Sequence, residues 1–199
     1  MPADYNQFVE PFVGGGSVFL NIQPNKLIIN DLNQELITAY QVIKSTPQAL
    51  ISLLQDYEKK HSLEFYEQLK KQETKNLTHL EVAARFIYLN KTGYNGLYRV
   101  NSQGEFNVPF GQKEKVKLFE RNNILSVSDY LRATDCQVLN KDYQKLLPLI
   151  QEGDFLFVDP PYDNDNGNGF TSYTADKFTR ENQQELASFL KECEKKGAK

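Results

Sequence analysis

The chain has 199 residues, a net charge of −3, 40% apolar residues and 12% aromatic residues. This composition excludes a disordered chain and predicts one sizeable domain, or one domain with an inserted lobe. No apolar run approaches the roughly 20 residues that span a bilayer, and no charged-then-apolar leader opens the sequence, so we expect a soluble, cytoplasmic protein. Cys136 and Cys193 predict neither a disulfide framework nor a zinc site, and no metal is expected.

The charges are unevenly distributed. Between Arg85 and Arg121 there are seven Lys or Arg and three Glu, so this segment carries +4 and the remainder −7. A basic lobe on an acidic body suits a polyanionic partner. A solvated charged face is the alternative explanation.

Residues 7–13 predict a first strand, which is stopped by a run of three glycines before a helix. Glycines at this place permit a tight turn and a close approach of backbone N–H groups to a ligand. Gly14 and Gly16 lack the third glycine of a dinucleotide fingerprint.

A second strand, residues 26–30, ends at Asp31. An acid after the second strand of a βαβ unit is placed to bind ribose hydroxyls. Asp31 could also cap the helix predicted over residues 33–44, and both roles could hold together. The glycine turn and this acid predict an adenosine-containing cofactor.

Residues 46–90 have helical periodicity, and Thr78 with Glu81 predicts a capping box. The apolar stripes predicted to be core are Leu50, Leu53, Leu54 and Tyr57 in one helix and Val82, Phe86 and Leu89 in a later one. His61 and His79 have no partners at metal-ligand spacing, and we assign them no chemistry.

Two short aromatic-rich arms around a polar turn predict a β-hairpin finger over residues 91–112. Polar and apolar side chains interleave along it: Lys91, Asn95, Arg99 and Asn107 with Tyr94, Leu97, Tyr98 and Pro109. Such a finger could enter a DNA groove, with Arg99 at a guanine edge and apolar groups at a thymine methyl. An ordinary surface hairpin with one packed aromatic side fits the same pattern.

A helix over residues 123–133 precedes a strand over 136–140, which ends near Asp142. If the sheet is parallel, Asp142 faces the same edge as Asp31 and the acid Asp159. We expect it to help hold the cofactor base or the target. After the next strand, a final helix is predicted from about residue 179 to 195.

The apolar strand over residues 154–158 runs into Asp159, Pro160, Pro161 and Tyr162. Two prolines end the sheet pairing, because they lack a backbone N–H. A carboxylate beside a carbonyl offers two acceptors for a flat amino group, and a tyrosine ring can stack on the attached base. A strand that ends in a turn with a surface Asp is the alternative.

The segment from Glu10 to Gly16, then Asp31, then Asp159 to Tyr162, with the finger between, closely resembles the S-adenosylmethionine-dependent DNA adenine N6-methyltransferases. The order is that of their α group, and the finger is similar to that of the GATC-modifying branch. The resemblance implies an α/β fold with a Rossmann-like sheet, incomplete here with strand order 3-2-1-4. It also implies a catalytic domain of residues 1–45 and 122–199 and an inserted, mostly helical recognition lobe of residues 46–121.

The resemblance implies roles for the residues that match its motifs. The adenine of double-stranded DNA is flipped, its N6 amine bonds to Asp159 and the Pro160 carbonyl, and Tyr162 stacks on it. The cofactor S-adenosylmethionine is held by Glu10, Phe12, Gly14, Gly16, Asp31, Asp142 and Asp159. DNA is bound by Lys91, Tyr94, Asn95, Leu97, Arg99, Asn101, Asn107, Pro109 and Lys113. Among these, Arg99 meets guanine, Leu97 and Pro109 meet thymine, and Tyr94 with Asn95 brackets the gap left by the flipped base.

The sequence departs from the family pattern at three places. Relatives can carry a basic residue where this chain has Gln112, and Lys113 is the residue expected to substitute for it. The lysine-bearing segment with which relatives start is absent, and the chain stops at Lys199 with its fourth strand as an expected uncovered edge. We therefore expect a fragment, a truncated product or half of a split enzyme, with a missing C-terminal half or a cognate restriction enzyme as partner.

Two other functions remain open at this point. One is a catalytically silent DNA-binding remnant, which the missing ends favour and the intact Asp159 and Tyr162 oppose. The other is an RNA adenine or protein glutamine methyltransferase, neither of which has an obvious use for the finger.

Overall fold

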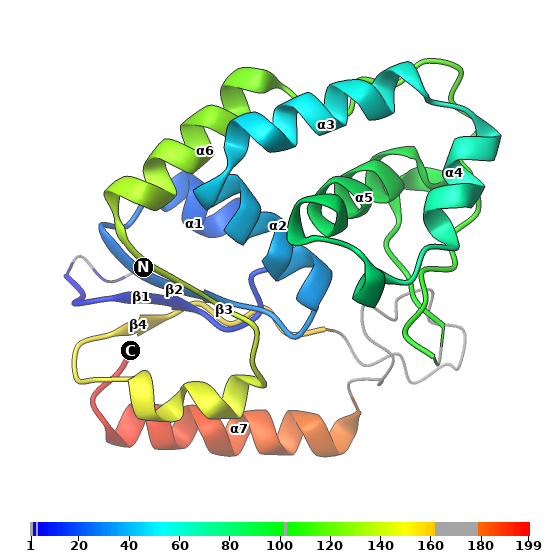
Figure 1. The fold of residues 1–199 in the computed structure, drawn as a ribbon. Helices are drawn as coiled ribbons and strands as arrows, with labels where there is room; N and C mark the ends of the chain where they lie inside the picture. Colours follow the sequence, from blue (N-terminus) through cyan, green and yellow to red (C-terminus); the bar gives the residue numbers. More distant parts are fainter. Residues whose placement is uncertain (1, 3, 102, 162–178) are drawn as a thin grey trace. The chain divides into compact units, whose positions relative to one another are not determined.

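The computed structural model describes residues 2, 4–101, 103–161 and 179–199 (Figure 1). These residues form two compact units, the first comprising 2, 4–37, 130–161 and 179–199 and the second 38–101 and 103–129. Among these residues, no helix is both long and apolar enough to cross a membrane. The predicted domain limits at 45 and 122 stay a prediction.

The first unit contains a four-stranded sheet in the order β3-β2-β1-β4, as the sequence predicts, and every pairing is parallel. Its strands are β1 (Phe8–Glu10), β2 (Lys26–Asn30), β3 (Asp135–Leu139) and β4 (Phe155–Leu156). Val9 in β1 lies opposite Ile28 in β2 and Leu156 in β4. The apolar residues of β1 and β2 are buried, which accounts for their near-continuous apolar sequences.

Two strands are shorter than predicted: β1 was expected over residues 7–13 and β4 over residues 154–158. β1 stops at Glu10 because Pro11 has no N–H for the ladder. The expected uncovered edge at the fourth strand is wrong in part, since the Leu156 N–H donates to the Lys199 carbonyl at 2.9 Å and the Lys199 N–H donates to the Asp154 carbonyl at 2.8 Å.

Each face of the sheet is covered within the first unit (Figure 1). On one face, Val9 and Ile28 pack with the 3-10 helix η3 (Tyr143–Leu149) and with α7 (Arg180–Lys195). On the other lies α1 (Ser17–Ile22), whose Phe19 is fully buried and stacks on Tyr130 with ring centroids 6.3 Å apart.

The remaining helical elements are α2 (Gln34–Ser45), α3 (Pro47–Lys59), α4 (Leu63–Lys70), η1 (Thr74–Asn76), α5 (His79–Thr92), η2 (Tyr94–Gly96) and α6 (Arg121–Ala133). The predicted apolar stripes are confirmed, since Leu50, Leu54 and Leu89 are core residues of the second unit. The predicted capping box of α5 is also confirmed, with the Thr78 N–H 2.8 Å from the Glu81 carboxylate.

Candidate active site

The carboxyl ends of parallel strands share one edge of the sheet, and the predicted cofactor and catalytic residues follow these ends. They are Glu10, Phe12, Gly14 and Gly16 after or at the end of β1, Asp31 after β2, Asp142 after β3, and Asp159 with Pro160 after β4. Tyr162 lies outside the described residues. Open α/β sheets bind their ligands at this edge.

Asn30, the last residue of β2, joins three strand ends. Its side chain is fully buried, and Nδ2 donates to the carbonyls of Pro11 and Lys141, both at 2.9 Å. Its Oδ1 accepts from the Lys141 N–H at 3.0 Å. The loops after β1, β2 and β3 are therefore fixed to one amide.

Asp31 links the second strand to the glycine turn. One carboxylate oxygen accepts from the Gly14 N–H at 3.1 Å, and the other accepts from the Asn33 N–H at 2.9 Å. Burial raises the pKa of this carboxyl, and backbone N–H groups of Asn33, Gly14 and Leu32 act against that rise. The alternative role of Asp31 as helix cap is wrong, because Asn33 caps α2 by accepting from the Leu36 N–H at 3.2 Å.

Glu10 carries the most unusual carboxyl group of this edge. The residue is 3% exposed, and its Oε2 has no hydrogen-bond partner among the residues that the structure describes. Burial raises the pKa of Glu10 to about 7, a backbone hydrogen bond from Phe19 acts against the rise, and the negative charge of Asp159 adds to it. This buried acceptor can receive a hydrogen bond from a donor on a ligand.

The other predicted residues of this edge differ in their surroundings. Asp159 is exposed and Pro160 is half-buried. Phe12 packs against Tyr143, with ring centroids 5.3 Å apart. The Asp142 carboxylate caps η3 by accepting from the Gln144 N–H at 2.9 Å, a local role that its position after a strand did not predict.

The predicted finger, in the second unit, is held by isolated bridges. Gly93 pairs with Phe110 and Val100 with Phe106, both antiparallel, but no strand is formed among the described residues of this segment. The two arms thus pair in antiparallel fashion at these bridges without forming continuous strands, and the β-hairpin stays a prediction. Asn95, with φ of 53°, turns the chain within η2, and Pro109 has no N–H to extend a ladder.

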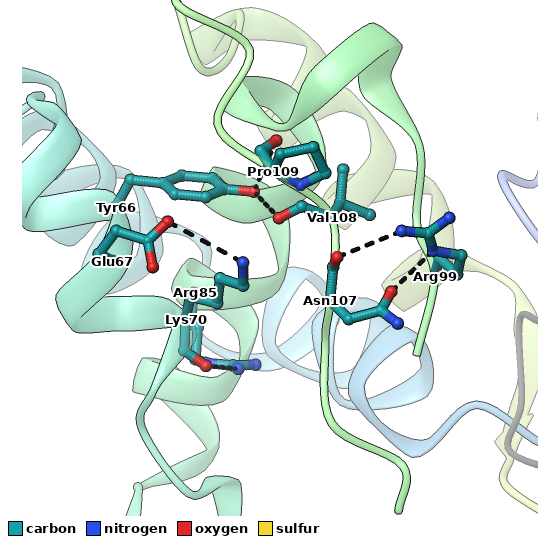
Figure 2. A network of polar contacts seen from close by, with 8 residues as sticks. All are labelled: Tyr66, Glu67, Lys70, Arg85, Arg99, Asn107, Val108 and Pro109. Carbon is teal, nitrogen blue, oxygen red and sulfur yellow. Dashed lines mark hydrogen bonds and ion pairs between the residues drawn. The ribbon is translucent and has the colours of Figure 1, made fainter. Parts of the chain in front are cut away.

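Two side-chain contacts fix the middle of the finger. Arg99 Nε donates to Asn107 Oδ1 at 2.7 Å, and a terminal nitrogen of the same guanidinium reaches the Asn107 carbonyl (Figure 2). Asn101 Oδ1 accepts from the N–H groups of Gln103 and Glu105, both at 2.9 Å, and thereby closes the turn. Arg99 is therefore oriented before any ligand binds.

The other predicted finger residues have distinct exposures. Asn95 and Pro109 are exposed, and Tyr94 is one of three large hydrophobic side chains more than half exposed among the described residues, at 54%. Leu97 is partly buried against the core of the second unit. Lys113 Nζ donates to the Lys91 carbonyl at 2.8 Å, so these two basic residues meet.

The base of the finger is held by glycines and a buried tyrosine. A Cβ on Gly93 would lie 2.8 Å from the Leu89 carbonyl, and one on Gly111 would lie 2.8 Å from the Thr92 carbonyl. The Tyr66 hydroxyl, on α4, donates to the Val108 carbonyl at 2.9 Å and also reaches Pro109 (Figure 2). Tyr66 could not be predicted from the sequence, since a buried aromatic residue on a helix gives no sign of such a partner.

Comparison with known proteins decides the family. Residues 1–199 match the model of the D12 class N6 adenine-specific DNA methyltransferases. The chain belongs to this family. The type II methyltransferase M1.LlaDCHI of Lactococcus lactis subsp. cremoris is 39% identical, with 99% of this chain and 71% of that protein covered. The type II methyltransferase M.MjaIII of Methanocaldococcus jannaschii is 37% identical (97% and 71% covered), and the DNA adenine methylase of Vibrio cholerae is 33% identical (95% and 68%).

As a D12 class protein, the chain is an adenine-specific DNA methyltransferase. Two residues that shape its candidate site were not predicted from the sequence. Asn30 is one, and the signal that could have found it is a polar residue that ends an apolar strand. Asn140 is the other, since its Nδ2 donates to the carbonyls of Asp31 and Leu32 at 2.9 and 3.0 Å.

Proposed function

We propose that this D12 class methyltransferase transfers the methyl group of S-adenosylmethionine to the N6 amine of an adenine in duplex DNA, within GATC. The observation that carries the proposal is the carboxyl edge of the sheet. There Asp31 is bonded to the turn at Gly14, and the buried Oε2 of Glu10 lacks a donor among the described residues.

The residues of this edge fit such a cofactor. A Cβ built on Gly14 or Gly15 meets no atom within 4 Å, so there is open space over the turn. Asp31 would hold ribose hydroxyls, and Glu10 would accept a hydrogen bond from a donor group of the cofactor. Gly14 and Gly16, with φ of 47° and 71°, shape the turn, while Phe12 and Asp142 border the same edge. When bound, the cofactor supplies an electrophilic methyl group on a sulfonium.

Asp159, Pro160 and Tyr162 would then act on the target base. The N6 lone pair of adenine is conjugated into the ring and is a poor nucleophile. The Asp159 carboxylate and the Pro160 carbonyl accept the two amine hydrogens, which draws nitrogen towards tetrahedral geometry and stabilises the positive charge developed on it. Tyr162 stacks on the base. As the N–C bond forms and the S–C bond breaks, one proton leaves N6, and the exposed Asp159 gives that proton a route to solvent.

The second unit, with its finger, would bind the DNA. Arg99, oriented by Asn107, suits the O6 and N7 edge of guanine, while Leu97 and Pro109 suit thymine methyl groups. Tyr94 and Asn95 are exposed and suit the gap beside a flipped base. Lys91, Lys113, Asn101 and the Asn107 side chain complete the polar surface. This combination supports GATC as the preferred site.

The decisive experiment measures methyl transfer from labelled S-adenosylmethionine to duplexes with GATC and to matched duplexes in which GATC is scrambled. We expect N6-methyladenine in the GATC duplex alone, loss of transfer in Asp159→Ala, and parental transfer in Asp135→Ala. Asp135 is an exposed acid at the opposite end of the sheet and serves as matched control. Transfer to both duplexes would refute the site preference only. DNA binding without any transfer would refute the enzyme and leave a silent DNA-binding protein.

A further inference from the structure

His61 uses both of its ring nitrogens, although the sequence assigns it no chemistry. Nδ1 lies 2.8 Å from the Tyr88 hydroxyl on α5, and Nε2 lies 2.8 Å from the Lys113 carbonyl after the finger. The ring also packs against Phe110, with centroids 5.6 Å apart. One imidazole therefore joins the loop before α4 to α5 and to the residues that end the finger.

The hydrogen-bond directions follow from the partners. A carbonyl oxygen only accepts, so Nε2 carries the proton and donates to Lys113. Burial raises the pKa of Tyr88 to about 12, and a backbone hydrogen bond from Ser62 acts against the rise. The phenol therefore keeps its proton, and its oxygen also accepts from the backbone N–H of Ser62. The hydroxyl and Nδ1 share one hydrogen bond at 2.8 Å.

The hydrogen bond from His61 to Lys113 helps to fix residues 111–113, whose central residue, Gln112, has an unusual backbone conformation. Gln112 has φ of 54°, a left-handed conformation that costs energy for a residue with a Cβ. Before it, the Gly111 N–H donates to the Thr92 carbonyl at 2.8 Å. After it, Lys113 is held by His61 through its carbonyl and by Lys91 through its ammonium group. The exposed side chain of Gln112 thus leaves the surface from a fixed point.

We propose that His61 is a positioning residue for DNA recognition, which acts by holding residues 111–113 so that Gln112 and Lys113 face the DNA in one arrangement. The proposal rests on the proposed function, because it supposes that the finger meets DNA. His61 touches neither the cofactor nor the reacting atoms in this role. Its effect falls on DNA binding and not on the chemical step.

Two substitutions, His61→Gln and His61→Asn, distinguish the contributions of the two ring nitrogens. The amide of Gln places its NH₂ near the Nε2 position and can still donate to Lys113, whereas the shorter Asn reaches only the Tyr88 side. His61→Leu removes both contacts at similar volume. We expect His61→Leu and His61→Asn to raise the KM for DNA about tenfold with kcat changed less than about twofold, and His61→Gln to stay close to the parent. His79→Ala, which removes the exposed histidine at the start of α5, is the control.

Hydrogen exchange gives a readout that does not need activity. The amides of residues 111–115 should exchange about tenfold faster in His61→Asn than in His61→Gln, with the rest of the second unit unchanged. If His61→Asn keeps the parental KM and exchange protection as well as His61→Gln does, the ring only fills space and the proposal is wrong. The proposal is also wrong if kcat falls by a factor similar to that by which KM rises. If the parent transfers no methyl group, the proposed function fails instead. The exchange of the Asn and Gln variants then still decides whether His61 holds this segment.

Discussion

Asn30 and Lys141 exchange two hydrogen bonds, with the Asn30 side chain acting as both donor and acceptor to the Lys141 backbone at 2.9 and 3.0 Å. The side-chain amide thereby imitates a strand partner beyond the point where β2 and β3 end. Because Asn30 also bonds to Pro11, the loops that carry the candidate cofactor residues share one buried anchor.

Asn30→Ala should therefore weaken both the fold and the cofactor site. It leaves the buried Pro11 carbonyl and the partly buried backbone groups of Lys141 without this partner, so we expect a loss of about 3 kcal/mol in the free energy of unfolding. The Kd for S-adenosylmethionine should rise with it. Urea unfolding and calorimetric titration measure the two effects. Asn140→Ala removes an exposed amide with two backbone partners and should cost less than about 1 kcal/mol.

Glu10→Gln should change how stability depends on pH. The carboxyl has a pKa of about 7 in the folded protein, above its ordinary value of 4.5, so the folded state binds the proton more tightly than the unfolded state. Stability of the parent, without cofactor, therefore falls as the pH rises from about 4.5 to about 7. The advantage of Glu10→Gln over the parent should grow by about 3 kcal/mol across that interval. Denaturant titrations at a series of pH values measure this, and an advantage that is independent of pH would contradict it.

Gly111→Ala should disrupt the base of the finger. The added Cβ would lie 2.8 Å from the Thr92 carbonyl and 2.9 Å from that of Gly93, and backbone atoms cannot move aside cheaply. We expect a loss of about 2 kcal/mol and a KM for DNA at least about tenfold higher. The matched control is Gly104→Ala at the turn, where a Cβ meets nothing within 4 Å and only the φ of 79° opposes it, at about 1 kcal/mol. Equal effects of the two variants would show that crowding at Gly111 is unimportant.

Asn107→Ala should release Arg99 from its preset orientation, which rests on the 2.7 Å hydrogen bond to Asn107 Oδ1. If Arg99 contacts guanine, a fixed guanidinium matters for discrimination more than for chemistry. We expect the preference for GATC over a site with that guanine replaced to fall about tenfold, with kcat on GATC nearly unchanged. In a double-mutant cycle, Asn107→Ala should have little further effect once Arg99 is replaced by Ala. Additive effects would contradict the coupling.

Local sequence patterns predicted the positions of the strands, because apolar runs and strand-ending residues depend on the local chain alone. Apolar runs that meet prolines or polar residues marked where the strands lie, so the edge with Asp31 and Asp159 could be deduced if the sheet was parallel. The strand order came from the family resemblance, and the structure has the same order. The finger was predicted in less detail, because its arms pair through single bridges and the left-handed turn at Asn95, with φ of 53°, is not marked by a glycine at that position.

Contacts between distant residues left no local signal. His61 meets partners 27 and 52 residues away, and Asn30 meets Lys141 across 111 residues. Nothing beside His61 in the sequence distinguishes it from a polar surface position, and Asn30 is marked only by its place at the end of an apolar strand, which does not reveal its partner. Such polar contacts depend on the tertiary fold, whereas apolar periodicity is set by the single helix or strand.

The parallel pairing of β1 with β4 has a consequence for biosynthesis. β1 ends at Glu10, but its neighbour β4 begins only at Phe155. The second unit lies between them in the sequence, over residues 38–101 and 103–129. At roughly 5–20 residues per second, a ribosome spends on the order of 10 s between them. During that interval the free side of β1 is an unpaired apolar edge, a hazard for association with other nascent chains. The yield of this enzyme in cells should therefore depend on holding chaperones more strongly than its final stability suggests.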